Sequence, residues 1–499
     1  MRLLFQTLLV LAPLCSIAAV TARAQDEALA AKSHAAKDAL IAGHYTQAAK
    51  LYRELAAALP GNPGPRLSLA LALEKAGHPA EAIPELDRVV HAEPRMAPAW
   101  FLLGLAYQQL GQPQKAIAPL QNAVRLDSTN LQAQIELADA EMGAGDARDA
   151  VEGFQSLAAR HPEMAKAWQG LGFAYATLGE RASKRLDEAA PHSSFWDALM
   201  ARARFAEGRY AEALALDREA IRQSPELAGL HAARAEIYRA AKHPDWAAVE
   251  DARESNVRKP DCPASAAACA YLSGDWAAAL AAAGKTISPE NLYWAALACA
   301  KLAEGAFQHV AALPSTPEIH ELMAESDQRL GRRVEAVAEW RKALAIAPHD
   351  RRLQGRLAES LDRDHQYEEA GQLLKPLVAA QPENGEWQYL MGEVLYRERR
   401  AELALPYLVA AQRLQPEHLE AMEILGRVYL ELDQPAKAIA CLEKARPLDD
   451  GSISFALNTA YRRLGREEEA RAALARYRRL TPGVQSAPST TGGSVIPPP

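Results

Sequence analysis

Aromatic residues are scarce in this chain, at 6% of 499 residues. A core of ordinary size must therefore be built mainly from Ala and Leu, which favour helices. The hydrophobic fraction of 49% is too high for a wholly disordered chain. The composition thus predicts a helical protein with room for several domains.

An excess of positive charge is also lacking. The formal net charge is -7 and the sequence pI is about 6.1. Such a balance gives no general attraction to nucleic acid or to anionic lipid. We therefore expect no nucleic-acid partner.

The short motifs of common enzyme classes are missing as well. The sequence contains no GxxxxGK[ST] phosphate loop, no HExxH zinc motif and no GxSxG nucleophile elbow. The 13 histidines are scattered along the chain. The sequence predicts no catalytic residue, no cofactor, no metal ion and no small-molecule substrate, and so favours a protein that is not an enzyme.

Cysteine is rare, with five residues in the chain. Cys262 and Cys269 are seven positions apart, which on one helix would separate them by about 10 Å along the axis, beyond the reach of a disulfide. A break at Pro263 would remove that objection. We expect Cys262, Cys269, Cys299 and Cys441 to be small buried apolar residues, with their redox state left open.

The first 24 residues have the layout of a secretory signal. Arg2 precedes an apolar run from Leu3 to Val20, and Ala22 and Ala24 supply the small residues of a cleavage site. An uncleaved anchor is the alternative, although Pro13 and polar residues interrupt the run. The segment predicts a periplasmic or secreted protein, associated with the envelope without a stable transmembrane span.

A period of 34 residues runs through the sequence. Glycines at this interval occupy positions 43, 77, 111, 145 and 179, and Ala48, Ala82, Ala116 and Ala150 keep the same step. A fixed period of this size indicates stacked copies of one supersecondary unit.

Each unit contains two helical windows joined by a short turn. Residues 99–110 and 115–126 form one such pair, with Gly111 in the turn. Leu103, Ala106, Tyr107 and Leu110 follow the three- and four-residue steps of a buried helical stripe. The unit is therefore predicted to be a helical hairpin.

These hairpins resemble the tetratricopeptide repeat. Trp100, Leu103, Gly104 and Tyr107 match the first-helix pattern of that family, as do Trp168, Leu171, Gly172 and Tyr175, and Ala150, Phe154 and Pro162 match its second half. The resemblance explains the costly glycine in the middle of a helix, because the position of Gly104 is where two helices approach most closely. It implies an all-α fold, an α-solenoid superhelix of stacked helix-turn-helix repeats.

The regularity of the repeats predicts the domain organisation. After the signal segment 1–24, we expect an N-terminal array at 25–255, a degenerate segment at 256–316, a C-terminal array at 317–482 and a disordered tail at 483–499. The stretch after Trp168 lacks a full second half, and a bend or hinge is predicted among the irregular repeats.

Arrays of this family commonly hold a peptide, or an extended segment of another protein, on the concave side lined by first helices. On that frame the early repeats place an apolar strip on the inner face, and the later ones a charged set with Tyr389 and Tyr396. The candidate partner-binding residues are Leu67, Leu71, Phe101, Leu105, Ile135, Phe173, Glu359 and Glu393. The strip could equally pack between neighbouring helices.

The sequence therefore favours an interaction scaffold of the bacterial cell envelope that binds a protein or peptide partner. The alternative is a periplasmic scaffold for polysaccharide export or modification. A polysaccharide partner would favour rows of exposed aromatic residues, of which Tyr389 and Tyr396 are the candidates.

Overall fold

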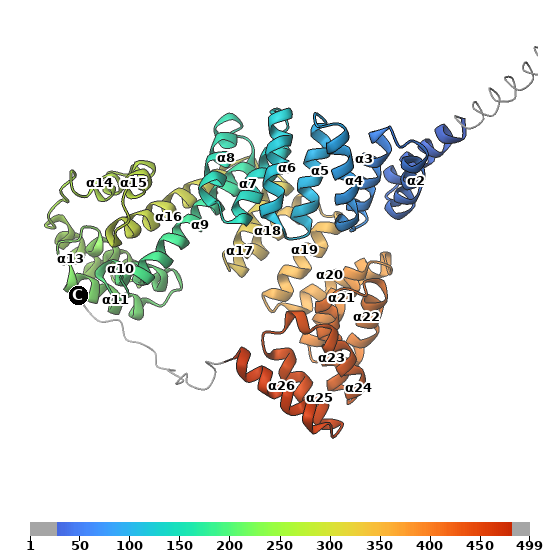
Figure 1. The fold of residues 1–499 in the computed structure, drawn as a ribbon. Coiled ribbons are helices and arrows are strands. Elements are labelled where there is room, and N and C mark those ends of the chain that lie inside the picture. Colours follow the sequence, from blue (N-terminus) through green and yellow to red (C-terminus); the bar gives the residue numbers. More distant parts are fainter. Residues whose placement is uncertain (1–26, 482–499) are drawn as a thin grey trace, which may run out of the picture. The chain divides into compact units, whose positions relative to one another are not determined.

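The computed structural model describes residues 27–481, and this part of the chain is helical without any strand (Figure 1). It divides into two compact units, 27–309 and 310–481. The all-α solenoid of stacked helical hairpins predicted from the sequence is confirmed. The predicted signal segment 1–24 and tail 483–499 lie outside the described residues.

The first unit begins with a helix at residues 27–41 and continues through α2 to most of α16. Its helices are α2 (Tyr45–Ala58), α3 (Pro63–Lys75), α4 (Pro79–Ala92), α5 (Ala97–Gln109), α6 (Pro113–Leu126), α7 (Leu131–Ala144), α8 (Ala147–Arg160), α9 (Ala165–Ala189), α10 (Ser194–Ala206), α11 (Tyr210–Gln223), α12 (Leu230–Ala240), α13 (Pro244–Ser255), α14 (Ala266–Leu272), α15 (Trp276–Ala283) and α16 (Pro289–Ala312).

The second unit consists of five further hairpins. Its helices are α17 (Pro317–Arg329), α18 (Arg333–Ile346), α19 (Arg351–Arg363), α20 (Tyr367–Ala380), α21 (Gly385–Arg397), α22 (Ala401–Leu414), α23 (Leu419–Glu431), α24 (Pro435–Lys444), the 3₁₀ turn η1 (Arg446–Leu448), α25 (Ser452–Arg463) and α26 (Glu467–Leu480).

The turn inside a hairpin follows from its residues. Gly111 has a φ of +66°, a conformation that costs a glycine nothing, and it ends the helix α5. Pro113 then opens α6 at a position where a backbone N–H would have no helical partner. This pairing of a glycine and a proline makes the chain reverse within a few residues.

One side-chain hydrogen bond recurs where one hairpin passes to the next. Trp100 Nε1 donates to the carbonyl oxygen of Pro94 at 2.9 Å, and Trp168 Nε1 donates to that of Pro162 at 3.0 Å. A glutamine makes the same bond, six residues back, at Gln134, Gln354 and Gln388. The bond fixes the entry of each first helix, which explains why tryptophan recurs at this position in a chain poor in aromatics.

The mid-helix glycines lie where two helices of a hairpin touch. A Cβ atom at Gly104 would lie 2.4 Å from Cγ of Leu120, and one at Gly392 would lie 2.5 Å from Cγ of Leu408. Real side chains do not approach so closely, so a larger residue would push the two helices apart. The predicted reason for Gly104 is confirmed.

The hairpin that begins at Trp168 lacks a second half of its own, as the sequence indicated. Gly179 belongs to the 34-residue series of glycines, but it lies inside α9, which continues to Ala189. No proline or capping Asp follows Gly179 to start a second helix, and its place for a Cβ is 3.1 Å from Cβ of Cys299. The irregularity of the array therefore begins at Gly179, ahead of the predicted degenerate segment at 256–316.

The second helix for this hairpin comes from α16. The Cβ position at Gly172 is 2.7 Å from Cε1 of Phe307, and the ring of Trp168 stacks on that of His309 with centroids 4.0 Å apart. Because Gly172 meets Phe307 while the later Gly179 meets the earlier Cys299, α9 and α16 run antiparallel. The hairpins α10–α15 are thus an insertion carried by two long helices, α9 and α16, as Figure 1 also shows.

Two of the four cysteines are not the small buried apolar residues that the sequence predicts. Cys262 and Cys269 form a disulfide, with Cα atoms 5.6 Å apart. The helix that would have separated them is absent, since α13 ends at Ser255 and α14 begins at Ala266. Cys299 and Cys441 are free and buried, as predicted.

Candidate protein-binding groove

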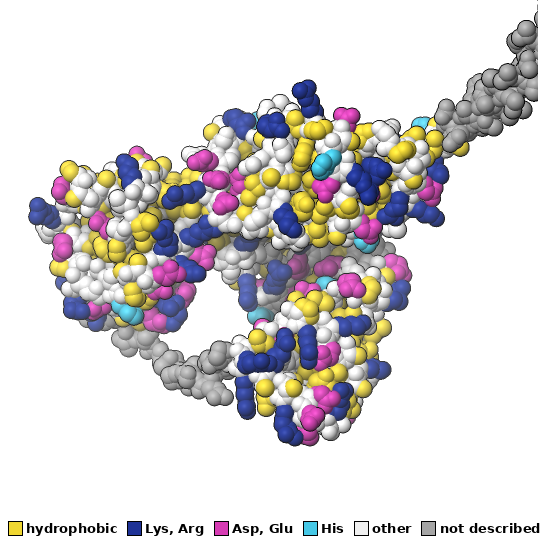
Figure 2. Space-filling view, in the orientation of Figure 1, with side chains coloured by type: hydrophobic (Ala, Val, Ile, Leu, Met, Phe, Trp, Pro, Cys, Tyr) yellow, Lys and Arg dark blue, Asp and Glu magenta, His cyan; other side chains and the backbone are white. Residues whose placement is uncertain are grey.

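The apolar residues predicted to line the inner face of the early repeats do not form one exposed strip. Leu67, Leu71 and Leu105 are half-buried and pack against the core of the first hairpins, and Phe101 packs against a smaller cluster that contains Leu120. On the face shown in Figure 2, side chains of Lys, Arg, Asp and Glu are interspersed with apolar ones in the first unit.

The predicted continuation of that strip is wrong. Ile135 and Phe173 are only 5% and 8% exposed. Phe173 meets Phe307 edge to face, with ring centroids 5.3 Å apart, because α16 covers this part of α9. Both side chains belong to the core. They therefore do not extend the predicted apolar strip beyond Leu105.

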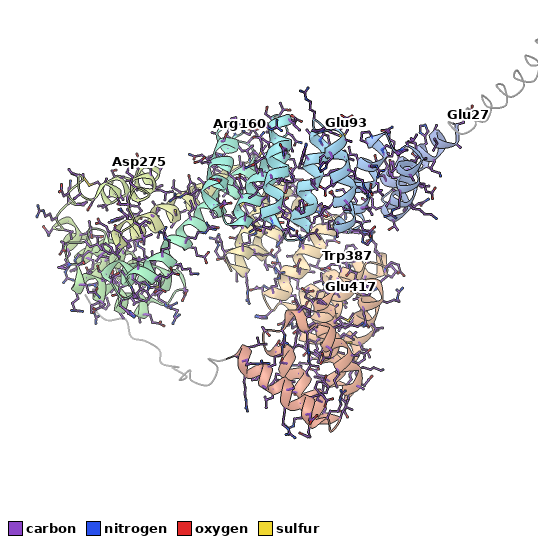
Figure 3. The ribbon with its side chains drawn as sticks, viewed as in Figure 1. Glu27, Glu93, Arg160, Asp275, Trp387 and Glu417 are labelled. Carbon is purple, nitrogen blue, oxygen red and sulfur yellow. A yellow bond between two sulfur atoms is a disulfide. The ribbon has the colours of Figure 1, made fainter. Side chains whose placement is uncertain are left out.

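The charged residues of the later repeats do come together. A groove of about 750 Å³ lies within the second unit and contains Glu359 of α19 and Glu393 of α21. Its wall is formed mainly by first helices of successive hairpins, near the helix starts that Trp387 and Glu417 mark in Figure 3. Its titratable residues are Arg333, Glu359, Asp362, Arg363, His365, Tyr367, Glu386, Tyr389, Glu393, Arg397, His418 and Glu420.

Two arginines of the groove are already paired with carboxylates. Arg363 Nη2 lies 2.7 Å from Oε1 of Glu359, and Arg397 Nη2 lies 3.1 Å from Oε1 of Glu393. Arg333 donates instead to the carbonyl oxygen of Arg363 at 3.2 Å. The lining contains five carboxylates and three arginines, so acidic side chains outnumber arginines.

Asp362 is the exceptional side chain of this groove. It is 9% exposed, and its Oδ1 atom is buried without a hydrogen-bond partner in the structure. Burial, together with the charge of Glu393, raises the pKa of Asp362 to about 6, while Arg397 and Arg363 oppose the shift. A buried carboxylate oxygen without a hydrogen-bond partner, in a cleft, is a physical marker of a candidate functional site.

The aromatic side chains of the groove have polar partners. Burial raises the pKa of Tyr389 far above its usual range, helped by the charge of Glu393 and a hydrogen bond to it. The Tyr389 ring meets His418 edge to face at 4.6 Å between centroids. Tyr389 and Tyr396 are both half-buried against the core, so they do not form an exposed row of aromatic residues.

Sequence reasoning found Glu359, Glu393 and Tyr389 but missed Asp362. Asp362 lies four residues after Ala358, the small packing position of α19, and Glu74 lies four residues after the equivalent Ala70. Glu74 is likewise buried, with an unpartnered Oε1. The available signal was an acidic residue at a position where the helical period predicts burial.

The described residues contain no cluster of three or more His, Cys, Asp or Glu side chains that could hold a metal ion. Among the helices of residues 27–481, none combines the length and the hydropathy needed to cross a membrane.

Family models match the chain along much of its length. Two models described as tetratricopeptide repeat match residues 67–130, 135–192 and 425–484, and residues 329–394, respectively. The chain contains tetratricopeptide repeats. A model described as anaphase-promoting complex, cyclosome, subunit 3 matches residues 363–445, within the second tetratricopeptide unit. No curated protein matches this chain.

Among solved structures, the tetratricopeptide array is similar to three that span different lengths of it. MamA from Desulfovibrio magneticus RS-1 is 21% identical over 34% of this chain and 97% of its own, with a TM-score of 0.30. The APC/C hetero-tetramer Cut9-Hcn1 is 14% identical over 90% of this chain and 93% of its own, with a TM-score of 0.34. YrrB, described as a TPR protein with an unusual peptide-binding site, is 21% identical over 33% of this chain and 87% of its own, with a TM-score of 0.28. The assignment of tetratricopeptide repeats rests on the hairpin packing and the family models.

Tetratricopeptide repeats are in general interaction modules without catalytic activity, and they support a role for this chain as a protein–protein interaction scaffold. The groove is consistent with such a role, because most of its lining residues are charged or polar and can bind a polar chain segment, whereas small-molecule pockets are lined mainly by apolar side chains.

Proposed function

We propose that this chain is a non-enzymatic scaffold of the bacterial cell envelope that holds a segment of a partner protein in the groove of its second unit. The groove carries this proposal because its lining comes from four successive first helices. Gln328 belongs to α17, Glu359 to α19, Glu386 to α21 and Glu420 to α23. A site that runs across stacked repeats suits an extended chain segment.

The place of the protein in the envelope rests on two supports. The sequence begins with the three parts of a secretory signal. The disulfide between Cys262 and Cys269 agrees with an oxidising compartment, since disulfides in most cytosolic proteins are kept reduced.

The groove can be tested with two matched pairs of substitutions. Glu386 and Glu420 line the groove, whereas Glu368 and Glu402 do not. All four are acidic residues in the first turn of their helices, so replacing either pair removes the same favourable interaction with a helix dipole.

The experiment is affinity purification of the mature chain from its native envelope. We expect the double variant Glu386→Lys with Glu420→Lys to lose the partner, and Glu368→Lys with Glu402→Lys to keep it, at equal melting temperatures. A partner retained by the groove variant contradicts the proposal.

A further inference from the structure

Asp362 is a buried carboxylate of the groove, and in the described chain its Oδ1 atom has no hydrogen-bond partner. The Oδ1 atom is buried, while 9% of the residue remains exposed and Asp362 lines the groove. A buried acceptor without a donor costs about 1 to 3 kcal/mol, and more when it is charged. A ligand that donates a hydrogen bond to this carboxylate would therefore bind favourably in the groove.

The neighbouring arginines form ion pairs with other carboxylates. Arg363 lies 2.7 Å from Glu359 and also belongs to an exposed helix end, while Arg397 is held by Glu393 at 3.1 Å. Glu393 receives a second hydrogen bond, from the hydroxyl of Tyr389. Each groove cation near Asp362 thus already has a carboxylate of its own.

The charge balance determines the class of ligand. Acidic side chains outnumber arginines in the lining, so it favours a cation that can donate a hydrogen bond. A metal ion is a poor candidate, because no three ligating side chains in the described residues are grouped to hold one. An ammonium or guanidinium group fits, and the half-buried ring of Tyr389 offers an apolar surface for the methylene groups of its stem.

We propose that Asp362 anchors a basic side chain, lysine or arginine, of the partner segment. Glu393 and Tyr389 stand beside this anchor, and the carboxylates of Glu386 and Glu420 attract the cation from the rim. The inference rests on the proposed function, because it names the chemistry of the segment that the groove holds.

The probes are pentapeptides with a central arginine, lysine or citrulline flanked by glycines. Acetylation of the N-terminus and amidation of the C-terminus remove the terminal charges. Citrulline has nearly the shape of arginine without its charge. Binding to the mature full-length chain is measured by ligand-observed NMR titration. We expect the arginine and lysine peptides to bind, and the citrulline peptide to bind about tenfold more weakly.

Asp362→Asn should weaken the arginine peptide by about tenfold and leave the citrulline peptide unchanged. Glu386→Gln, a matched change at the exposed rim, should have a much smaller effect on it. Equal binding of the arginine and citrulline peptides overturns the inference, and so does undiminished arginine binding by a folded Asp362→Asn chain.

The native partner separates this inference from the proposed function. If the Glu386→Lys and Glu420→Lys chain loses the partner while Asp362→Asn retains it at full yield, the groove binds the partner and the basic anchor is wrong. If both variants retain the partner, both proposals are wrong. Loss of the partner in both variants, with the peptide results above, supports both.

Discussion

Gly172 of α9 faces the ring of Phe307 of α16, 135 positions later in the chain, at a distance that leaves no room for a Cβ atom. In the regular hairpins the equivalent partner follows 16 positions after the glycine, as Leu120 follows Gly104 and Leu408 follows Gly392. The contact therefore continues the stacking of the array across the inserted hairpins α10–α15. It makes α9 and α16 the structural support of the whole insertion.

This relationship predicts the effect of substitutions at Gly172. Gly172→Leu should lower the free energy of unfolding by about 1 to 3 kcal/mol or more, because the side chain overlaps the Phe307 ring. Gly172→Ala should be milder, since better helix propensity offsets part of the strain. Gly305→Ala is the control, because Gly305 lies in α16 with nothing within 4 Å of its Cβ position, and it should stabilise by up to about 1 kcal/mol. Urea denaturation followed by circular dichroism compares the three variants. Equal midpoints for all three would show that Gly172 has room for a side chain beside Phe307.

The cysteines give a prediction that a mass spectrum can check. The chain is extracted from its native envelope, unfolded and treated with maleimide, before and after reduction. We expect two adducts without reductant, from Cys299 and Cys441, and four after it, when Cys262 and Cys269 are released. A fifth adduct would show that Cys15 is retained and that the predicted cut before Gln25 does not occur. Four adducts without reductant would argue against an oxidising compartment.

Asp362 gives a prediction about pH. Burial, followed by the charge of Glu393, raises the pKa of its carboxyl from 3.8 to about 6, so the folded chain binds this proton more tightly than the unfolded chain. The cost of the charged form is therefore absent below pH 4 and develops as the pH rises through 6. Asp362→Asn should be more stable than the wild type by about 1 kcal/mol at pH 7.5, and this advantage should shrink at pH 5. An advantage of equal size at both pH values would mean that Asp362 does not titrate in this range.

The apolar residues of the first unit allow a competing assignment to be tested. Phe101 and Leu105 are half-buried against core clusters, so Phe101→Glu with Leu105→Glu should destabilise the chain by about 2 to 4 kcal/mol. Phe455→Glu, at a side chain that is 54% exposed, should have little effect on stability. Thermal melts and partner purification are compared. An unchanged melt with loss of the partner would place the binding site on this apolar face instead of the groove.

The architecture could be read from the sequence because its cause is local and repeated. Many hairpins share a turn glycine such as Gly111 and a small packing residue such as Gly104, and some open their second helix with a proline such as Pro113. In the early repeats the glycines recur every 34 residues. The pairing of α9 with α16 has no repeated sequence pattern, because Phe307 is far from Gly172 in the sequence. The helix α16, which covers Gly172, follows the inserted hairpins α10–α15.

The groove could be predicted only in part, for a different physical reason. The period of the first helices places Glu359 and Glu393 on one face, and the structure brings both to the same groove. Whether Asp362 finds a donor depends on where the neighbouring arginines form their own pairs, which residue spacing does not determine. The disulfide was missed because it depends on the break before α14, which allows Cys262 to turn back towards Cys269.

Site-specific photo-cross-linking in the living cell tests the central claim most directly. The photo-reactive amino acid p-benzoylphenylalanine is placed at Glu386, on the rim of the groove, or at Glu402, in the matching first turn of α22 outside it. If the groove holds the partner, one discrete protein should be cross-linked at position 386 and not at position 402. Cross-linking at 402 alone, or the same yield at both positions, would contradict the account.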